Sequence, residues 1–142
     1  MEYKCILIAV DGSVHTKRAA DKGVSLAKQL NAAIVMVSII DHADVLGDID
    51  SGVLPEESKA VVEKSQRAML KSFIDSYPDT NIQCVILEDN PEEAIVRVAE
   101  EVKADMIVIG GHQKGFVEEL FTLNIRKYIL SHTRIPLMVV PS

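Results

Sequence analysis

The chain of 142 residues contains little cysteine, few aromatic residues and no run of positive charge, and these shortages exclude several classes of protein. Its two cysteines, Cys5 and Cys84, fit neither a CxxC redox motif nor a zinc site, and both lie in apolar runs, so we expect reduced thiols in the core. Acidic residues outnumber basic ones by 21 to 15, which gives a net charge of −6. Because nucleic acids are held mainly by clustered basic residues, the sequence predicts no nucleic-acid partner.

Long apolar stretches are also absent, since none approaches the ~20 residues that a membrane span needs. The first apolar run, residues 5–10, ends at Asp11-Gly12-Ser13 rather than at a small-residue cleavage site. We therefore expect a cytoplasmic protein without a membrane partner. Hydrophobic residues make up 48% of the chain and are mostly aliphatic, because only 4% of all residues are aromatic. This composition and length predict one globular domain over residues 1–142.

Five short apolar runs, rich in β-branched residues, stand out instead. Each is apolar at nearly every position, which is typical of parallel strands that are buried on both faces. The runs are residues 5–10, 33–40, 82–87, 106–109 and 137–140.

Helical patterns separate these runs. We expect Ser13 to cap the first helix, Pro55 to begin the second, and Asn90 to cap the third, with Pro91 in its first turn. A fourth helix is expected from about Asn124. The first helix carries a stripe of small residues that allows close approach to a sheet: Ala20, Gly23, Val24 and Ala27.

The order βαβαβαβαβ predicts an α/β fold, an open five-stranded parallel sheet with helices on both faces, of Rossmann-like type. In such sheets, ligands bind beyond the carboxyl ends of the strands at the topological switch point. Residues 11–13 and 110–115 form loops at such ends, and residues 41–54 form a long loop, a candidate flap.

The glycines of residues 110–115 have two interpretations. Glycines let a backbone approach phosphates, and a following helix N-terminus supplies amide donors for an anion. Alternatively, Gly110, Gly111 and Gly115 only make a tight exit from the strand. Neither G-x-G-x-x-G nor the Walker pattern occurs, so the residues alone leave both interpretations open.

Metal binding and hydrolysis have weaker support. His42, His112 and the loop aspartates suggest a metal site, but Gly52 stands fifth in the segment from Asp48, whereas a calcium EF loop needs its glycine sixth. Ser13 lacks a G-x-S-x-G setting. We therefore expect no metal and no catalytic residue.

Several separated segments resemble the universal stress protein family. They are residues 3–13 (YKCILIAVDGS), 90–95 (NPEEAI), 105–112 (DMIVIGGH) and 135–141 (IPLMVVP). The resemblance spans the whole chain and implies the same five-stranded parallel α/β fold.

Many members of that family bind ATP through a motif G-x2-G-x9-G-[ST], an acidic residue after the first strand and an apolar residue at the end of the second. Here Asp11, Ile39 and Gly110 match, but Gln113, Leu123 and Asn124 replace two glycines and the hydroxyl. The chain is similar to the branch that lacks the glycine motif, which implies no tight ATP binding and no cofactor. The candidate residues of this degenerate nucleotide site are Val10, Asp11, Ile39, Gly110, Gly111, Gln113 and Asn124.

The alternative implied by the resemblance is a regulatory switch that binds ATP or AMP, with Mg, in a remodelled site. Asn124 would then cap a helix, and Lys114 or Arg126 would supply positive charge. An enzyme of the wider nucleotide-binding superfamily is disfavoured, because its signature loops H-x-G-H and S-G-G-x-D-S are absent.

The last apolar run predicts a homodimer. In this topology the fifth strand lies at a sheet edge, where open N–H and C=O groups invite pairing with a second copy. Pro136 and Pro141 flank the strand, so its four residues stay free to pair. The expected interface residues are Leu137, Met138, Val139 and Val140. The resemblance implies the function of a non-enzymatic stress-response homodimer that acts through contacts with a protein partner.

Overall fold

The computed structural model describes residues 2–11, 14–41, 55–111 and 116–141. Its strands are β1 (Cys5–Ala9), β2 (Ala33–Asp41), β3 (Ile82–Asp89), β4 (Met106–Gly111) and β5 (Leu137–Pro141). Its helices are α1 (Val14–Leu30), α3 (Pro55–Asp75), α4 (Pro91–Glu101) and α5 (Phe116–His132). The strands form one parallel sheet in the order β3-β2-β1-β4-β5, which confirms the expected fold class.

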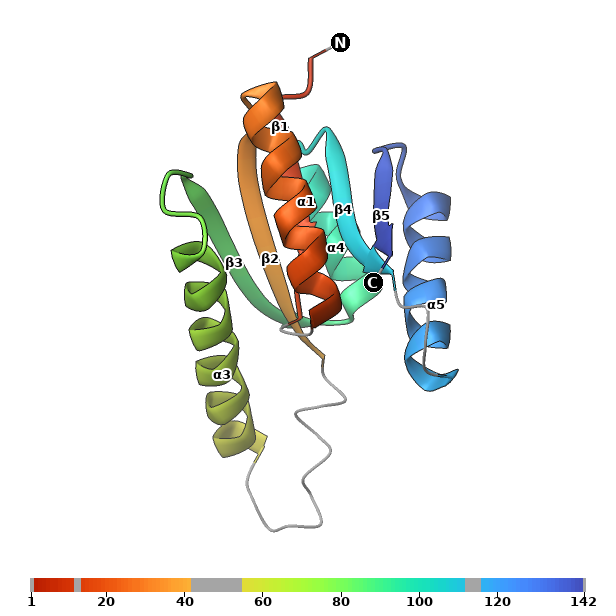
Figure 1. Cartoon of the computed structure of the whole chain (residues 1–142). Helices are drawn as coiled ribbons and strands as arrows, with labels where there is room; N and C mark the ends of the chain where they lie inside the picture. Colours follow the sequence, from red (N-terminus) through yellow and green to blue (C-terminus); the bar gives the residue numbers. More distant parts are fainter. Residues whose placement is uncertain (1, 12–13, 42–54, 112–115, 142) are drawn as a thin grey trace.

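The helices cover both faces of this sheet (Figure 1). Buried residues of α1 and α3, such as Ala20 and Phe73, share one core cluster with the strand residues Ile8 and Met36. Buried residues of α4 and α5 form a second cluster with strand residues that point to the other face of the sheet, such as Leu7 and Val35. Because both faces of β1 are buried, the central strand is apolar at every position, as the sequence pattern predicts.

Helix α1 packs closely on the sheet through its small residues, as the sequence predicts. A Cβ added at Gly23 would stand 2.7 Å from Ile8 Cδ1 and 3.5 Å from Val108 Cγ1. Ala20, Val24 and Ala27 are buried on the same side. The absence of a side chain at residue 23 therefore sets how near α1 approaches β1 and β4.

The helix ends follow from local chemistry. Asn90 caps α4 as expected, since its side chain accepts hydrogen bonds from the amides of Glu92 (3.1 Å) and Glu93 (3.3 Å). A residue in the left-handed conformation follows both α1 and α4, namely Asn31 (φ 54°) and Lys103 (φ 55°), and paired backbone hydrogen bonds of the Schellman type close both helix ends.

Two strand expectations are wrong. β3 has no fully buried residue, because it stands at the edge of the sheet, and its Gln83 and Cys84 are exposed. Cys84 is therefore not a core thiol, whereas Cys5 is half-buried; both thiols are free. Gly110 and Gly111 do not belong to a loop either, since β4 continues through them.

The start of the last helix also differs from the expectation. α5 begins at Phe116, so Asn124 lies within the helix instead of capping it. The expected cap Ser13, residues 42–54 of the candidate flap and the candidate residues His112, Gln113 and Lys114 lie outside the described residues. Asp41, predicted to begin the flap, is instead the last residue of β2. Among the described helices, none has the length and apolar character to cross a membrane.

Candidate functional site at the switch point

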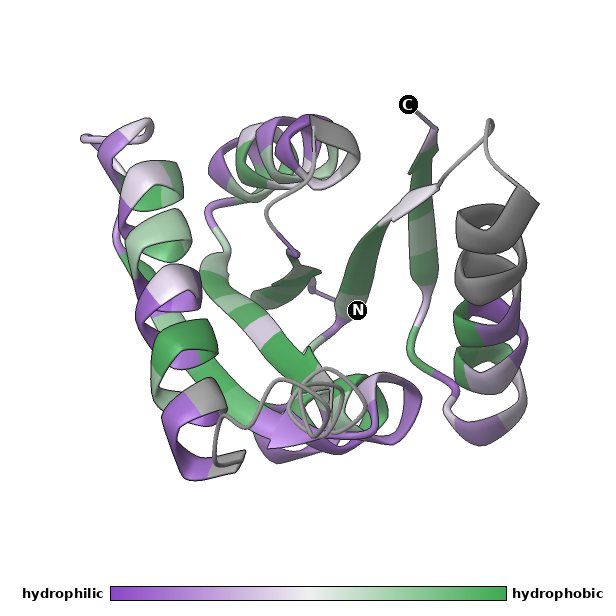
Figure 2. Ribbon diagram, turned by 90° about the horizontal axis from the view of Figure 1, so that it is seen from below, coloured by the Kyte–Doolittle hydropathy of each residue, from purple (hydrophilic) through white to green (hydrophobic). Residues whose placement is uncertain are grey.

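The topological switch point lies between β1 and β4. From β1 the chain adds β2 and β3 on one side, and it then returns to the other side of β1 for β4 and β5. The carboxyl ends of β1 and β4 therefore meet at one edge of the layer, seen from below in Figure 2. Val10 and Asp11 follow β1 here, and Gly110 and Gly111 end β4.

Asp11 is tied to the first turns of α1. Its amide donates to Thr16 Oγ1 (3.4 Å), and the Thr16 hydroxyl donates to Asp11 Oδ1 (3.1 Å). Asp11 is exposed, whereas Thr16 is only 8% exposed. The carboxylate therefore faces the solvent side of the switch point while the hydroxyl beneath it holds its orientation.

Val10 and Ile39 contribute to opposite faces of the sheet. Val10 is buried in the cluster under α1, and its amide donates to the carbonyl of Val37 (2.9 Å). Ile39 is half-buried against the cluster under α4 and α5, on the part of β2 that continues past the end of β1 and pairs with Leu87 of β3. Val10 therefore packs in the core, whereas Ile39 is the half-buried apolar candidate near the carboxyl end of β2.

Gly111 is needed for packing. It pairs with Pro141 of β5, and a Cβ at this position would stand 2.8 Å from Val139 Cγ1. Gly110 pairs with Val140 and is half-buried. The lack of a side chain at Gly111 therefore lets β4 pack closely against Val139 of β5.

The positions that correspond to the end of the ATP motif lie inside a helix. Leu123 and Asn124 are the eighth and ninth residues of α5, counted from Phe116. Asn124 is exposed and Arg126 is half-buried, with an enclosed Nε that has no hydrogen-bond partner among the described residues. The structure thus separates Asn124 from the helix N-terminus, where an anion would be bound.

Ion pairs surround the carboxyl end of β3. Glu88 pairs with Lys59 of α3 (2.8 Å), and Asp89 pairs with Arg97 of α4 (2.7 Å). The hydrogen bond and the charge of Glu88 raise the pKa of Lys59. Our sequence reasoning missed both cations, as it missed Thr16. For Thr16 a signal exists, a hydroxyl residue five positions after a strand-end aspartate.

Within the part of the chain that the structure describes, no three His, Cys, Asp or Glu side chains are grouped to hold a metal ion. The candidate site thus comprises an oriented carboxylate, a strand-end glycine and an apolar residue on β2, near the switch point of a Rossmann-like α/β sheet. Proteins of this class often bind nucleotides at that position.

The model of the universal stress protein family matches residues 2–141, and the chain therefore belongs to this family. A universal stress protein of Methanocaldococcus jannaschii is 28% identical over 140 residues, which cover 97% of this chain and 82% of that protein. A universal stress protein of Thermus aquaticus is 29% identical over 140 residues, 97% of this chain and 98% of that protein.

Solved structures share the fold at lower identity. The hypothetical protein MJ0577 superposes with a TM-score of 0.80 at 20% identity, over 100% of this chain and 98% of that one. A universal stress protein from Archaeoglobus fulgidus, solved in complex with dAMP, gives 0.67 at 18% identity over 99% of both chains. A universal stress protein in complex with cAMP gives 0.63 at 19% identity, over 99% of this chain and 98% of that one.

Proposed function

We propose that this protein is a non-enzymatic stress-response protein that forms a homodimer, acts through contacts with protein partners and does not bind ATP tightly. The observation that carries the proposal is the start of α5 at Phe116. This observation concerns ATP binding, the chemical activity that the complete family motif would imply.

The position of α5 supports this proposal, because it argues against a phosphate contact at Leu123 and Asn124. Only the first four amides of an α-helix lack an intrahelical partner. Leu123 and Asn124 lie beyond those four, so their N–H groups bond to carbonyls within α5. Neither amide is free to bind a phosphate, and Asn124 also lacks the geometry of a helix cap.

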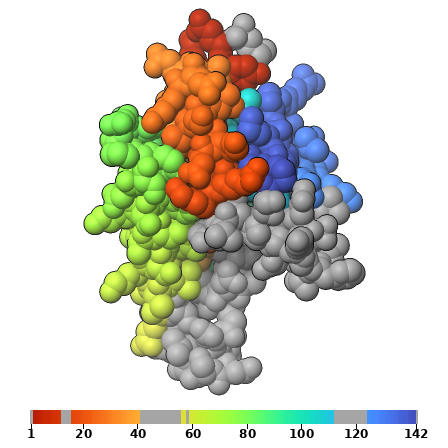
Figure 3. Space-filling view, viewed as in Figure 1, coloured from red at the N-terminus to blue at the C-terminus, as the bar shows by residue number. Residues whose placement is uncertain are grey.

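The β5 edge supports the dimer. β5 pairs with β4 on one side and ends the sheet on the other. Met138 and Val140 contact the cluster under α1, and Leu137 and Val139 contact the cluster under α4 and α5. Figure 3 shows β5, in dark blue, at the surface beside α1. Antiparallel pairing of β5 with its copy would satisfy the open edge around a two-fold axis.

A thermal unfolding assay with Mg·ATP tests the nucleotide part. A ligand at one hundred times its dissociation constant stabilises a protein by about 2.7 kcal/mol, which raises the melting temperature of a domain of this size by roughly 8 °C. We expect millimolar Mg·ATP to give less than a quarter of that shift. A shift of full size would contradict the proposal.

Light scattering tests the dimer. The native protein should show twice the chain mass of 15.6 kDa at tens of micromolar. The amides of successive strand residues point to opposite sides, one toward β4 and the next toward the open edge of the sheet. One of the two variants Met138→Pro and Val139→Pro therefore removes only an N–H group that points to the open edge. That variant should keep its circular dichroism and become monomeric, while Val139→Thr should stay dimeric. A monomeric wild type, or two dimeric proline variants, would place the interface elsewhere.

The second candidate is a nucleotide-binding switch that takes ATP or AMP, with Mg, at Asp11, Ile39 and Gly110. It is favoured by relatives of the same fold that were solved with dAMP and cAMP. In this case AMP or Mg·ATP should raise the melting temperature, and Asp11→Ala should abolish the rise.

A further inference from the structure

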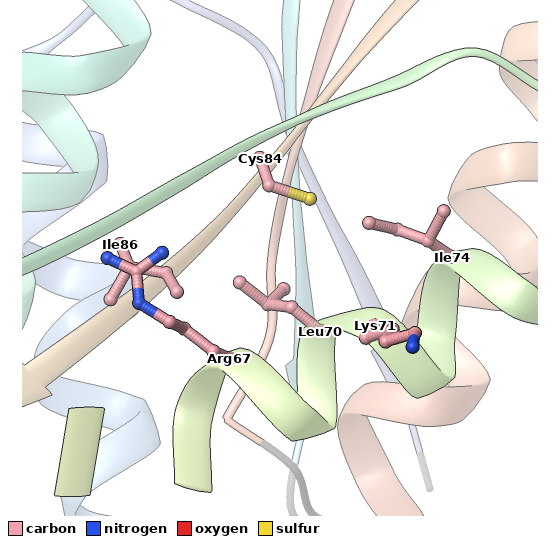
Figure 4. Close-up of a pocket in the computed structure, with 6 residues that line it drawn as sticks. All are labelled: Arg67, Leu70, Lys71, Ile74, Cys84 and Ile86. Atoms are coloured by element: carbon pink, nitrogen blue, oxygen red, sulfur yellow. The ribbon is translucent and has the colours of Figure 1, made fainter. Parts of the chain in front are cut away.

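A groove separates α3 from β3 at the edge of the sheet opposite to β5 (Figure 4). Its volume is about 220 Å³, and its lining consists of Arg67, Leu70, Lys71, Ile74, Cys84 and Ile86. Leu70 extends from α3 toward β3, and the Cys84 thiol extends from β3 into the groove. Desolvation raises the pKa of this thiol, so it contributes a neutral wall at neutral pH. The groove is distinct from the switch point between β1 and β4.

The edge strand β3 lacks the features that usually block pairing with another chain. It is eight residues long, contains neither proline nor lysine, and carries its only charges, Glu88 and Asp89, at its carboxyl end. Alternate residues of an edge strand direct N–H and C=O groups away from the sheet. Such a strand is a ready template for an added strand, and the exposed Gln83 and Cys84 leave the amino-terminal half of β3 accessible.

The rim of the groove carries an excess of positive charge. Arg67, Lys71 and Ile74 lie at i, i+4 and i+7 and therefore share one face of α3. Arg67 forms an ion pair with Glu63 (2.9 Å), yet its side chain remains 66% exposed. Lys71 is exposed and has no recorded ion pair among the described residues. Lys64 and Asp75 share this face, at i−3 from Arg67 and i+4 from Lys71, so three cations stand against the carboxylates of Glu63 and Asp75. This leaves an excess of one positive charge at the rim, above an apolar floor.

We propose that β3 and this groove bind an extended acidic segment of a partner protein, which pairs with the free edge of β3. One apolar side chain of the segment enters the groove between Leu70 and Ile86. Carboxylates two residues away, on the same side of the added strand, lie beside Arg67 and Lys71. Main-chain hydrogen bonds then supply affinity, and the groove supplies specificity. This inference rests on the proposed function, because it specifies the chemistry of the protein partner.

A labelled peptide, Glu-Thr-Leu-Thr-Glu-Thr, tests the inference by fluorescence polarisation on the full-length protein. We expect saturable binding, weakened about fivefold by Lys71→Glu. Lys127→Glu makes the same charge change on the exposed side of α5, at the opposite edge of the sheet, and should leave binding unchanged. A peptide with lysine in place of glutamate should prefer the Lys71→Glu variant. Equal binding of both peptides to the wild type would overturn the charge assignment and with it the inference.

Hydrogen exchange locates the bound peptide. Amides of β3 should become protected, and those of β5 should not change. No binding at about 1 mM peptide, or protection confined to another element, overturns the inference. A native mass above that of the dimer, caused by pairing of β3 with a second copy of this chain, also overturns the inference. The proposed function is tested separately, because the β5 dimer and the missing Mg·ATP shift do not depend on the peptide.

Discussion

The substitution Gly23→Ala tests how tightly α1 is held against the sheet. Two effects oppose each other. Alanine stabilises a helix interior relative to glycine by about 1 kcal/mol. The new Cβ, however, stands 2.7 Å from Ile8 Cδ1 and 3.0 Å from Ile8 Cγ1, whereas carbon atoms in contact prefer about 3.5–4.0 Å. Ile8 and Val108 are fully buried, so any shift of the Ile8 side chain must be accommodated within the packed core.

Overpacking of this kind costs about 1–3 kcal/mol. We therefore expect a net loss of about 1 kcal/mol in the free energy of unfolding, measured by urea denaturation at an unchanged m-value. Ser25→Ala, on the exposed side of α1, gains helix propensity without a clash and should not destabilise the protein.

The variant Ile8→Val removes the clashing Cδ1 atom and gives a second check. Alone it should cost about 0.5–1.5 kcal/mol. Combined with Gly23→Ala, it should cost less than the sum of the two single changes by about 1 kcal/mol, because the two residues are in contact. A Gly23→Ala protein as stable as the wild type, or strict additivity, would refute the claim that this contact limits the approach of α1.

Three further predictions concern stability. Asp11→Ala should cost about 1 kcal/mol in urea denaturation, because the mutual hydrogen bonds with Thr16 are lost; a loss of several kcal/mol would show a larger structural role and weaken the site assignment. Lys103→Gly should gain about 0.5–1 kcal/mol, because glycine adopts φ 55° without the steric cost of a Cβ, and destabilisation would contradict this. Desolvation raises the pKa of Asp21, but hydrogen bonds from Tyr77 and Lys17 outweigh it and leave the pKa lowered from 3.8. A carboxylate whose pKa is lower in the folded than in the unfolded state stabilises the fold at pH values above the unfolded pKa. The free energy of unfolding of the wild type should therefore exceed that of Asp21→Asn by less as the pH falls below about 3.8, and a constant difference in acid titrations would refute this.

The α/β class and several helix starts follow from local sequence. Apolar runs with helical patterns between them admit few arrangements other than a parallel sheet covered on both faces. Pro55 begins α3 and Asn90 caps α4 as predicted, because proline geometry and a side-chain amide act on neighbouring residues alone. The residues of the switch point were also predictable, since parallel strands bring their carboxyl ends to one edge.

Other features depend on contacts between distant parts of the chain. Cys84 lies in an apolar run that reads like a central strand, and only the strand order places it at an exposed edge. Apolar residues are spread around α5 rather than confined to one stripe, so its start at Phe116 was not visible in the periodicity. The candidate nucleotide site shows the same division. Asp11 was predictable as a strand-end acid, but its bond to Thr16 and the placement of Asn124 inside α5 arise from how the helices pack and where they begin. A local sequence pattern indicates which residues favour burial. The strand order and the helix packing, which bring distant parts of the chain together, decide which of those residues are actually covered.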